Sequence, residues 1–433
     1  MKDVFETIVL NFEDETLKSQ VDDLYNRMQN QDLQFNSKID QIIITQSSKK
    51  RIVLNVERES LEELTLKYLK KRLDNIFNIK YPNRTKIMRN CFSIFRSINK
   101  MRDFVIFRYD FKDFFQSVRS ADIFDRYIAS SNLSRFEKDI LETMTKLYDR
   151  CFPGLPTSNA FIEIITRDFD LRLRAKLVRF GLISYYRYVD DGIMVFNRYI
   201  DELEIKNIIR ETLREVFIKS KVKLNKNKIT YMSKSSCQEE DFTYLGYYFK
   251  ITNENNKIKF KYGISEKKLK KYRNKLLKII KDYKDNKKVE LFRQRLQFLI
   301  SRVVFYNNFS SKYSKQANWD VIGIVSNYYE LRNYINQSDK ITYKTEKFLT
   351  RELIDIIDDK LGSENRPFFL KNEYKAYTLK YGMENKKSIV FHPNIGWSQQ
   401  HLINKINRLD SSVSTSRRSY RELVKIYISL LKL

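Results

Sequence analysis

Hydrophobic residues along this chain follow two spacings, which separate expected strands from expected helices. Short runs of β-branched and aromatic residues predict strands at 41–45, 51–56, 104–107, 183–186 and 193–196. Hydrophobic positions three or four residues apart predict helices that begin near Leu61 or cover 119–130, 133–150, 158–179 and 200–217. The pattern therefore predicts an α+β fold in which an antiparallel sheet is packed by helices.

The last part of the chain has a different pattern. Two strand-like stretches, 242–251 and 257–262, predict a hairpin. After Ser265, a favourable N-cap residue, hydrophobic positions keep helical spacing, and lysines occupy the other faces. Four or five more helices are expected in 300–433, so we predict a mostly α-helical C-terminal domain.

Composition predicts short loops and gives no cysteine or histidine motif. Glycine (9 residues) and proline (5) are scarce among the 433 residues. The three cysteines, Cys91, Cys151 and Cys237, are too widely spaced for a zinc or disulfide pattern, which fits a reducing cytosol. Both histidines, His392 and His401, lie near the C-terminus. The sequence shows neither a signal-peptide pattern nor an apolar stretch of membrane-spanning length, so we expect no membrane span.

The charge is strongly basic and unevenly placed. The chain has 82 basic and 54 acidic residues, a net charge of +28, yet residues 1–64 hold only 8 of the basic and 13 of the acidic ones. An excess of this size indicates a polyanionic partner held by phosphate contacts. Lysine-rich helices that merely face solvent have the same composition, so charge alone leaves both interpretations open.

Two adjacent carboxylates, Asp190 and Asp191, stand between the strand-like runs 183–186 and 193–196. The Asp-Gly step at Gly192 predicts a tight hairpin, because glycine accepts the positive φ of such turns. Adjacent aspartates repel each other, and a divalent cation with oxygen ligands would remove that repulsion. An ordinary solvated turn has the same local sequence, so the hairpin alone does not decide between a metal site and a solvent-exposed turn.

A third carboxylate, Asp110, follows the buried run 104–107 and precedes a turn into a helix. A carboxylate at a strand end and a pair on a hairpin can converge on two metal ions. In-line phosphoryl transfer needs that arrangement, since one ion activates the attacking oxygen and both stabilise charge on phosphorus. Asp113 is expected to cap the following helix rather than to bind metal.

At this point the chain resembles a reverse transcriptase. Its five matching motifs, in the family's order, are Asp110 with Phe114-Phe115, Gly154-Leu155-Pro156-Thr157-Ser158, Tyr188 to Asp191, Leu224 to Lys228, and Phe242 to Gly246. The resemblance covers roughly 65–262. Within the family, the runs Arg108 to Val118 and Tyr81 to Arg84 resemble the bacterial abortive-infection, defence-associated branch.

The resemblance implies three segments and a metal site. They are an acidic N-terminal extension (1–64), right-hand polymerase fingers and palm (65–262), and a basic α-helical thumb-like domain (263–433). Asp110, Asp190 and Asp191, with the Phe111 backbone carbonyl, are expected to bind two Mg²⁺ ions, for which Mn²⁺ could substitute. Phe115 matches the family's aromatic gate against ribonucleotides; the alternative is a core phenylalanine, which is what we expect of Phe114.

Further contacts are implied by position in the motifs. Those expected for the nucleotide are Arg84, Lys86 and Arg89 of the fingers, Pro156 and Ser158 of the template loop, and Lys228 near the leaving pyrophosphate. Lys226 is an equal candidate for the last role, and the template loop lacks the commoner Gln-Gly. Those expected for nucleic acid are Tyr188, Leu245 and Gly246 of the hairpin regions, and Lys268, Lys271 and Lys275 of the basic helix.

The sequence thus predicts an RNA-directed DNA polymerase that makes cDNA from deoxynucleotides on an RNA template. The branch implies antiphage defence in the bacterial cytoplasm, a dedicated non-coding RNA and no membrane. A homo-oligomer or an accessory defence protein is left open. Two rivals remain: a protein-primed or untemplated DNA polymerase, and an RNA-binding scaffold with a vestigial palm.

Overall fold

Strand β3 (Val105–Asp110) lies inside a four-stranded antiparallel sheet with the order β4-β5-β3-β6. Its direct neighbours are β5 (Asp191–Phe196) and β6 (Thr230–Ser233), and β4 (Leu182–Tyr188) pairs with β5 at the edge of the sheet. All residues of β3 except Arg108 are buried, which explains the near-continuous hydrophobic run in the sequence. The computed structural model describes all residues except 11–14, 47–48, 237, 255–256, 309–316, 363 and 433.

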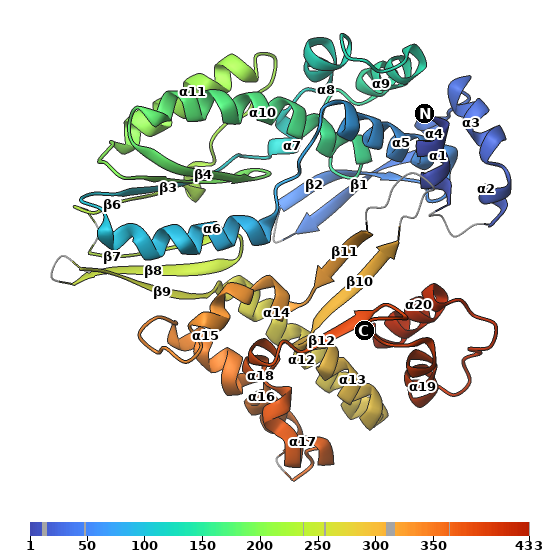
Figure 1. Ribbon diagram of the computed structural model, residues 1–433, viewed down its shortest axis with the longest axis vertical. Helices are drawn as coiled ribbons and strands as arrows, with labels where there is room; N and C mark the ends of the chain where they lie inside the picture. Colours follow the sequence, from blue (N-terminus) through green and yellow to red (C-terminus); the bar gives the residue numbers. More distant parts are fainter. Residues whose placement is uncertain are drawn as a thin grey trace. The chain divides into compact units, whose positions relative to one another are not determined.

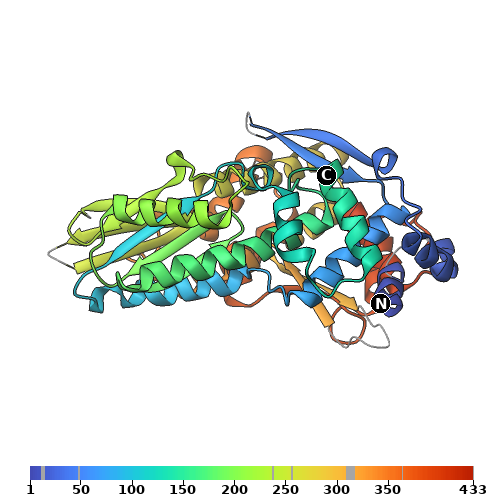
Figure 2. The ribbon, with the colours of Figure 1, turned by 90° about the horizontal axis from the view of Figure 1, so that it is seen from above.

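Helix α10 (Pro156–Val178) is the main support of this sheet. It begins with proline at the first helical position, where the missing N–H costs nothing, and it packs against β4, α5 (Leu61–Ile76) and α11 (Glu202–Val216). Figure 2 shows α10 and α11 running side by side along the sheet. The expected helices at 61, 158–179 and 200–217 are confirmed. The expected pair at 119–130 and 133–150 is α8 (Ser120–Ile123), a π-helical turn (Phe124–Ile128) and α9 (Arg135–Leu147).

The expected strands near the N-terminus form the hairpin of β1 (Ile39–Gln46) and β2 (Lys49–Val56). The Leu54 amide donates to the Pro153 carbonyl at 2.9 Å, which ties β2 to the loop before α10. Gly154 has a φ of +106°, and a Cβ there would lie 1.9 Å from the Leu54 carbonyl oxygen. Glycine is therefore required at this contact. The sequence predicts a turn over 47–50 between these strands, but Lys49 and Lys50 belong to β2, and Ser47–Ser48 lie outside the described residues.

Three strands follow the first sheet: β7 (Glu239–Tyr244), β8 (Tyr247–Glu254) and β9 (Lys257–Ile264). The β8–β9 hairpin is the one expected from sequence, although its turn at 255–256 lies outside the described residues. The sequence analysis missed a second turn, because it treated 242–251 as one strand. Leu245 and Gly246 both have positive φ, +47° and +83°, and form a two-residue loop between β7 and β8.

The C-terminal part begins with α12 (Glu266–Asn286), whose N-cap is Ser265 as expected, although the serine side chain makes no capping hydrogen bond. The part after residue 300 is mostly helical as expected, but it also contains strands that the sequence analysis did not predict. A sheet with the order β11-β10-β12 lies there (Figure 1), built from β10 (Arg302–Asn308), β11 (Ala317–Ile322) and β12 (Ser388–Phe391). Val303 to Phe305 and Ile389 to Phe391 supply the β-branched and aromatic residues that favour strands.

The other elements are mostly short helices. They are α1 (Lys2–Val9), α2 (Glu15–Ser19), α3 (Val21–Gln29), α4 (Phe35–Lys38), α6 (Arg84–Ser97), α7 (Phe114–Ser117), α13 (Val289–Ile300), α14 (Ile324–Asn327), α15 (Tyr343–Lys347), α16 (Leu353–Leu361), α17 (Phe368–Glu373), α18 (Leu379–Glu384), α19 (Gln399–Leu409) and α20 (Tyr420–Leu431).

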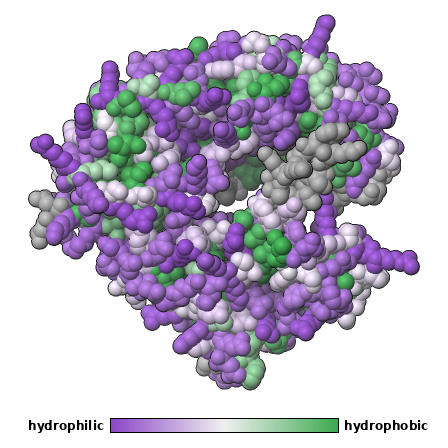
Figure 3. All heavy atoms as spheres, viewed as in Figure 1, coloured by the Kyte–Doolittle hydropathy of each residue, from purple (hydrophilic) through white to green (hydrophobic). Residues whose placement is uncertain are grey.

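The chain divides into two compact units. The first contains Met1–Ile87 and Ser97–Ser236, and the second contains Met88–Arg96, Cys237–Asn308 and Gln316–Leu433, each within its described residues. Among these residues no helix is long and apolar enough to cross a membrane. The face in Figure 3 is mostly hydrophilic, as expected for a chain with 31% charged residues. Cys91 and Cys151 are buried free thiols, and Cys237 lies outside the described residues.

Candidate active site

The hairpin of β4 and β5 carries the paired carboxylates, but its turn differs from the expected one. Tyr188 pairs with Asp191, so the loop consists of Val189 and Asp190, and Val189 has the left-handed φ of +59°. A β-branched residue in this region is strained, because its branched Cβ crowds the backbone. Gly192 lies in β5 instead, where a Cβ would lie 2.3 Å from the Tyr109 ring. The glycine therefore serves close packing against Tyr109 rather than the turn.

Asp110 and Asp191 face each other in register on adjacent strands, β3 and β5. The Asp110 side chain accepts hydrogen bonds from Asn225 Nδ2 at 3.0 Å and from Lys228 Nζ at 2.7 Å. The Asn225 amide also donates to the Asp110 carbonyl at 2.8 Å. The segment that follows α11 therefore holds the carboxylate at the end of β3 from two sides. Of the two candidate lysines, the structure brings Lys228, not Lys226, to Asp110.

The three carboxylates differ in their electrostatic environment. Burial, together with the negative charges of Asp110 and Asp191, raises the pKa of Asp190 to about 6. Burial also raises the pKa of Asp191, but the guanidinium of Arg108 opposes that shift through an ion pair of 2.6 Å. Asp190 is thus the carboxylate with the least compensated charge.

A small cavity of about 80 Å³ lies in front of Asp110 and Asp190. Its lining residues are Arg51, Asp110, Phe111, Asp113, Phe114, Phe115, Gln116, Pro153, Asp190, Asn225 and Lys228. Phe115 is half-buried at this cavity, whereas Phe114 is only 3% exposed. Asp113 occupies the N-cap position of α7 with a φ of +47°, but its side chain makes no capping hydrogen bond, contrary to expectation.

Arg51 is a cavity residue that the sequence analysis missed. It lies on β2, in the segment 1–64 to which no chemistry was assigned. Basic residues are frequent in this chain, so its position in sequence carried no signal. The tie between Leu54 and Pro153 brings β2 to the cavity, and this contact between distant segments cannot be read from local pattern.

Several other expected site residues do not line the cavity. In the first unit these are Arg84, Lys86, Pro156, Ser158 and Tyr188. Ser158 is buried at the start of α10, and Tyr188 is half-buried at the end of β4. Their nucleotide and nucleic-acid contacts stay predictions.

The remaining expected residues belong to the second unit. Arg89 forms an ion pair with Glu330 at 3.7 Å, and Leu245 and Gly246 form the β7–β8 turn. Lys268, Lys271 and Lys275 lie on α12, where Lys271 and Lys275 are exposed and Lys268 is half-buried. Their roles in nucleic-acid binding also stay predictions.

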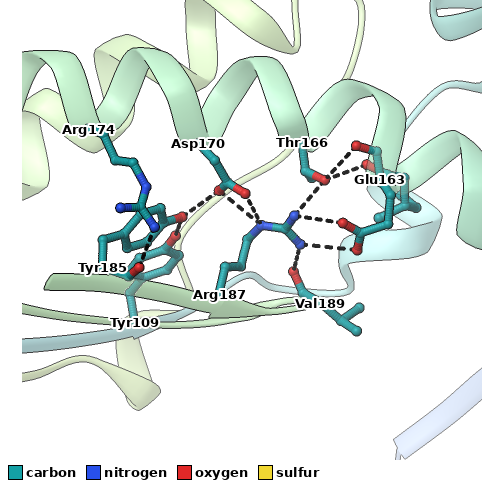
Figure 4. Close-up of polar contacts among 9 residues, drawn as sticks. Tyr109, Glu163, Thr166, Asp170, Arg174, Tyr185, Arg187 and Val189 are labelled. Carbon is teal, nitrogen blue, oxygen red and sulfur yellow. Dashed lines mark hydrogen bonds and ion pairs between the residues drawn. The ribbon is translucent and has the colours of Figure 1, made fainter. Parts of the chain in front are cut away.

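Arg187 connects the strained turn to helix α10 (Figure 4). Its buried guanidinium donates to Asp170 Oδ1 at 3.0 Å, to Glu163 Oε2 at 3.0 Å and to Thr166 Oγ1 at 2.8 Å, all on α10. It also donates to the Val189 carbonyl at 2.8 Å. The same residue thus pairs with two carboxylates of the supporting helix and holds the residue before Asp190. Sequence reasoning did not single it out.

A second chain of contacts lies beside Arg187 in Figure 4. The Tyr185 hydroxyl donates to Asp170 at 2.7 Å and is 2.7 Å from the Tyr109 hydroxyl. Burial raises the pKa of Tyr185 well above its usual value, so this hydroxyl stays protonated. Because the Tyr109 ring packs against Gly192, this chain supports the hairpin from β3.

The three carboxylates have the oxygen donors that Mg²⁺ prefers. The pKa of Asp190 is raised because its negative charge is buried and is not balanced, and a bound cation would balance it. Within the described part of the chain, no three His, Cys, Asp or Glu side chains are already gathered around one point. Lys228 and Arg108 hold Asp110 and Asp191 instead. The Lys228 side chain is 46% exposed and is free to turn away, so the donor set fits a divalent cation.

An antiparallel sheet with carboxylates at the ends of two neighbouring strands, supported by packed helices, is a polymerase palm. Residues 43–249 match the family model described as reverse transcriptase (RNA-dependent DNA polymerase), a match that begins within the segment 1–64. This domain indicates a nucleotidyltransferase enzyme of the RNA-directed DNA polymerase class.

Solved structures of telomerase match this chain at low similarity, and the chain spans less than two thirds of the length of the first of them. Telomerase from Candida albicans, in complex with a fragment of telomeric RNA, is 13% identical with a TM-score of 0.41, and the alignment covers 91% of this chain and 64% of that chain. Apo telomerase from Candida tropicalis is 10% identical with a TM-score of 0.37, covering 94% and 72%. A comparison with curated proteins finds no match.

Proposed function

We propose that this protein copies an RNA template into cDNA by joining deoxynucleotides to a 3′-hydroxyl, with release of pyrophosphate. One observation carries the proposal. Asp110 and Asp191 face each other in register, and Asp190 and Asp110 share a cavity with the half-buried ring of Phe115. Carboxylates grouped in this way, within a reverse transcriptase domain, are what nucleotidyl transfer requires.

Asp110, Asp190 and Asp191, with the Phe111 carbonyl, would hold two Mg²⁺ ions, or Mn²⁺ in their place. Bound ions would lower the pKa of the attacking hydroxyl and stabilise negative charge on the phosphate. The protein's own residues do the positioning. Asn225 fixes the end of β3 through its hydrogen bonds to Asp110, and Lys228 places a positive charge beside the same carboxylate.

Around these carboxylates, three cavity residues are proposed to contact the nucleotide. Arg51 would neutralise phosphate charge from β2, Lys228 would approach the leaving pyrophosphate, and the Phe115 ring would exclude a ribose 2′-hydroxyl. Arg84, Lys86, Arg89, Pro156 and Ser158 remain candidates for further nucleotide contacts. Tyr188, Leu245, Gly246, Lys268, Lys271 and Lys275 remain candidates for contacts to template and product.

The motifs at Arg108 to Val118 and Tyr81 to Arg84 favour a role in bacterial antiphage defence. We place the protein in the bacterial cytoplasm with a dedicated non-coding RNA as template. Deep sequencing of RNA and DNA that co-purify with wild type and with Asp190→Ala tests this setting. A single enriched RNA, with cDNA present only in the wild type, is the expected result, and random cellular RNA would contradict it.

The catalytic assignment is tested by primer extension on an RNA template. Asp110→Ala, Asp190→Ala and Asp191→Ala should each lower incorporation by ~10²-fold or more, as the loss of a key electrostatic group does. Asp113→Asn removes a carboxylate from the same cavity and should stay close to wild type, because asparagine tolerates the left-handed backbone of Asp113. Activity of Asp190→Ala above about a hundredth of wild type would sink the assignment.

Two alternatives are distinguished by the same protein preparations. A protein-primed or untemplated polymerase would leave DNA covalently attached to a tyrosyl peptide after proteolysis. A scaffold with a vestigial palm would keep its biological function in Asp190→Ala. All three carboxylates are present, and specific partners hold two of them, Asp110 and Asp191, which favours an active palm over a vestigial one.

A further inference from the structure

The C-terminal sheet places three aromatic side chains side by side, one from β10, one from β11 and one from the residue that follows β12. Tyr306 on β10 pairs directly with Trp319 on the antiparallel strand β11. On the other side, β12 runs parallel to β10 with Phe305 opposite Phe391, so that His392, just beyond β12, lies next to Tyr306. The ring centroids are 4.6 Å apart for Tyr306 and Trp319, 4.7 Å for Tyr306 and His392, and 5.9 Å for Trp319 and His392.

The opposite face of the same sheet is a hydrophobic core. Val303, Phe305, Ile389 and Phe391 pack there against residues of α19 and α20. Because side chains alternate along a strand, Tyr306 and His392 point away from this core. The two faces therefore differ in kind: one holds the sheet to its helices, and the other carries three neighbouring rings.

These rings are accessible and fixed in place. Trp319 is 42% exposed, and Tyr306 and His392 are half-buried. The amides of Asn394 and Ile395 donate to His392 Nδ1 at 3.1 and 3.3 Å, which sets the orientation of the imidazole. A ring surface held in this way loses little entropy when a flat ligand stacks on it.

A cross-strand aromatic pair also stabilises a sheet by itself, and this accounts for one contact, Tyr306 with Trp319. It does not account for the third ring or for leaving a tryptophan so exposed, since burial is what makes its large apolar surface stabilising. Sheets with exposed aromatic residues on neighbouring strands are used to stack unpaired bases. The net charge of +28 suits a polyanion that carries such bases.

We propose that Tyr306, Trp319 and His392 form a stacking platform for unpaired bases of single-stranded nucleic acid. The platform gives the second unit a ligand-binding site of its own, made of other residues than the carboxylate site of the first unit. The inference rests on the proposed function only in taking nucleic acid as the partner. It needs no nucleotide, no metal ion and no synthesis, so it can fail or succeed independently of catalysis.

The chain offers a direct probe, because it contains two tryptophans, Trp319 and Trp397. Trp397→Phe leaves Trp319 as the sole tryptophan and replaces a ring that packs on Phe391 and Tyr427 with a similar one. The full-length variant is titrated with (rU)12, (dT)12 and a twelve-residue abasic phosphodiester, in EDTA and without nucleotides. The expected result is quenching of Trp319 by base-containing strands and none by the abasic strand. Quenching by (rU)12 alone would identify RNA as the ligand.

Affinity measured by anisotropy of a labelled strand provides the second test. Tyr306→Ala, Trp319→Ala and His392→Ala should weaken binding by about 5- to 150-fold for each stacked base lost. Phe368→Ala is the matched control, because Phe368 is an aromatic residue of the same unit that is 77% exposed, and it should bind as wild type.

The readouts separate the proposal from its alternatives. Asp190→Ala should bind strands like wild type whatever its synthetic activity, so a failed catalytic assignment leaves this test intact. Absence of quenching, equal quenching by the abasic strand, or equal losses in the Phe368→Ala control would overturn the platform. The quenching measurement requires no substitution at the platform, so it holds even if Trp319→Ala unfolds the sheet.

Discussion

Lys228 Nζ lies 2.7 Å from Asp110 Oδ2, whereas Lys226, two residues earlier, is exposed and makes no ion pair with any described carboxylate. Both lysines lie in one turn of 3₁₀-helix, Lys226–Lys228. Such a helix has three residues per turn, so side chains two positions apart point in different directions. The backbone therefore selects one of two chemically identical side chains for the site.

We predict that Lys228→Met slows nucleotide incorporation by roughly 10²-fold, because it removes a charge placed beside the reacting groups. Lys226→Met removes the same charge from the same turn and should change the rate less than about threefold. Single-turnover incorporation with saturating template measures both. Equal losses in the two variants would show that only overall charge matters here.

The electrostatics of Asp190 predict that its charge destabilises the metal-free protein. Its pKa is raised to about 6, so the folded state keeps this proton when the unfolded state has lost it. As pH rises from about 4 to about 6, the carboxyl ionises first in the unfolded chain, and the free energy of unfolding falls. Below about pH 4 the group is protonated in both states and has no effect.

Asp190→Asn should therefore stabilise the protein in EDTA at pH 7.5, by on the order of 2 kcal/mol, and should have no effect near pH 4. Denaturant unfolding at the two pH values measures the difference. Mg²⁺ should stabilise wild type more than the variant, since it binds the folded state through these carboxylates. A variant that is less stable than wild type at pH 7.5 would contradict the electrostatic account.

Phe115 and Phe114 should respond differently to substitution. Both residues border the cavity, but Phe115 is half-buried, whereas Phe114 is 3% exposed and its ring packs 4.9 Å from Phe111 and 6.0 Å from Phe217 in the core. Phe115→Val should raise ribonucleotide incorporation relative to deoxynucleotides, while Phe114→Ala should cost about 3–5 kcal/mol of stability. Competition assays and thermal unfolding measure the pair. If Phe115→Val unfolds the protein without altering sugar choice, Phe115 is a packing residue.

Arg187 is predicted to position the carboxylate hairpin. Arg187→Lys keeps the charge but loses the planar fork that reaches Asp170, Glu163 and the Val189 carbonyl together. The rate at saturation should fall about tenfold or more with KM for deoxynucleotides unchanged, because a small displacement of reacting groups is costly. The Mg²⁺ concentration needed for half-maximal rate should rise.

The controls for Arg187 separate position from stability. Arg187→Met leaves the half-buried carboxylates of Glu163 and Asp170 without their ion-pair partner and should be worse than Arg187→Lys in rate and in melting temperature. Arg172→Met breaks an exposed ion pair with Asp168 on the same helix and should leave the rate unchanged. A rate that falls only in proportion to the folded fraction would assign Arg187 a purely structural role.

Site residues that can be recognised from their neighbours in the sequence were predicted correctly as to position. The aspartates stand at strand ends next to aromatic runs, and helix α10 has a proline start and regular spacing. Partners that meet across long separations were not found. Arg187 lies 17 residues from Asp170 and 24 from Glu163, and Arg51 reaches the cavity from another segment. Such contacts depend on how elements pack, which local pattern does not contain.

Two of the errors of pattern have physical causes as well. The Asp-Gly step suggested a turn because glycine tolerates positive φ, yet Gly192 lies in β5, two residues after the Val189-Asp190 loop, where packing against Tyr109 requires a glycine. The C-terminal strands were overlooked because β12 spans only four residues and pairs with residues of β10 that lie 86 positions earlier. Runs of β-branched and aromatic residues at 303–305 and 389–391 were the available signal.

The hydrogen bonds that Asn225 and Lys228 donate to Asp110 have a consequence for biosynthesis. These hydrogen bonds join residues 115 and 118 positions apart, and β6, which closes the sheet beside β3, follows them. During translation, a nascent chain that has emerged only as far as the β4–β5 hairpin carries all three carboxylates but not the groups that hold Asp110. We expect the polymerase to be synthesised in an inactive form and to mature only when the ribosome has released the segment after α11, so that catalysis is delayed until the palm is complete.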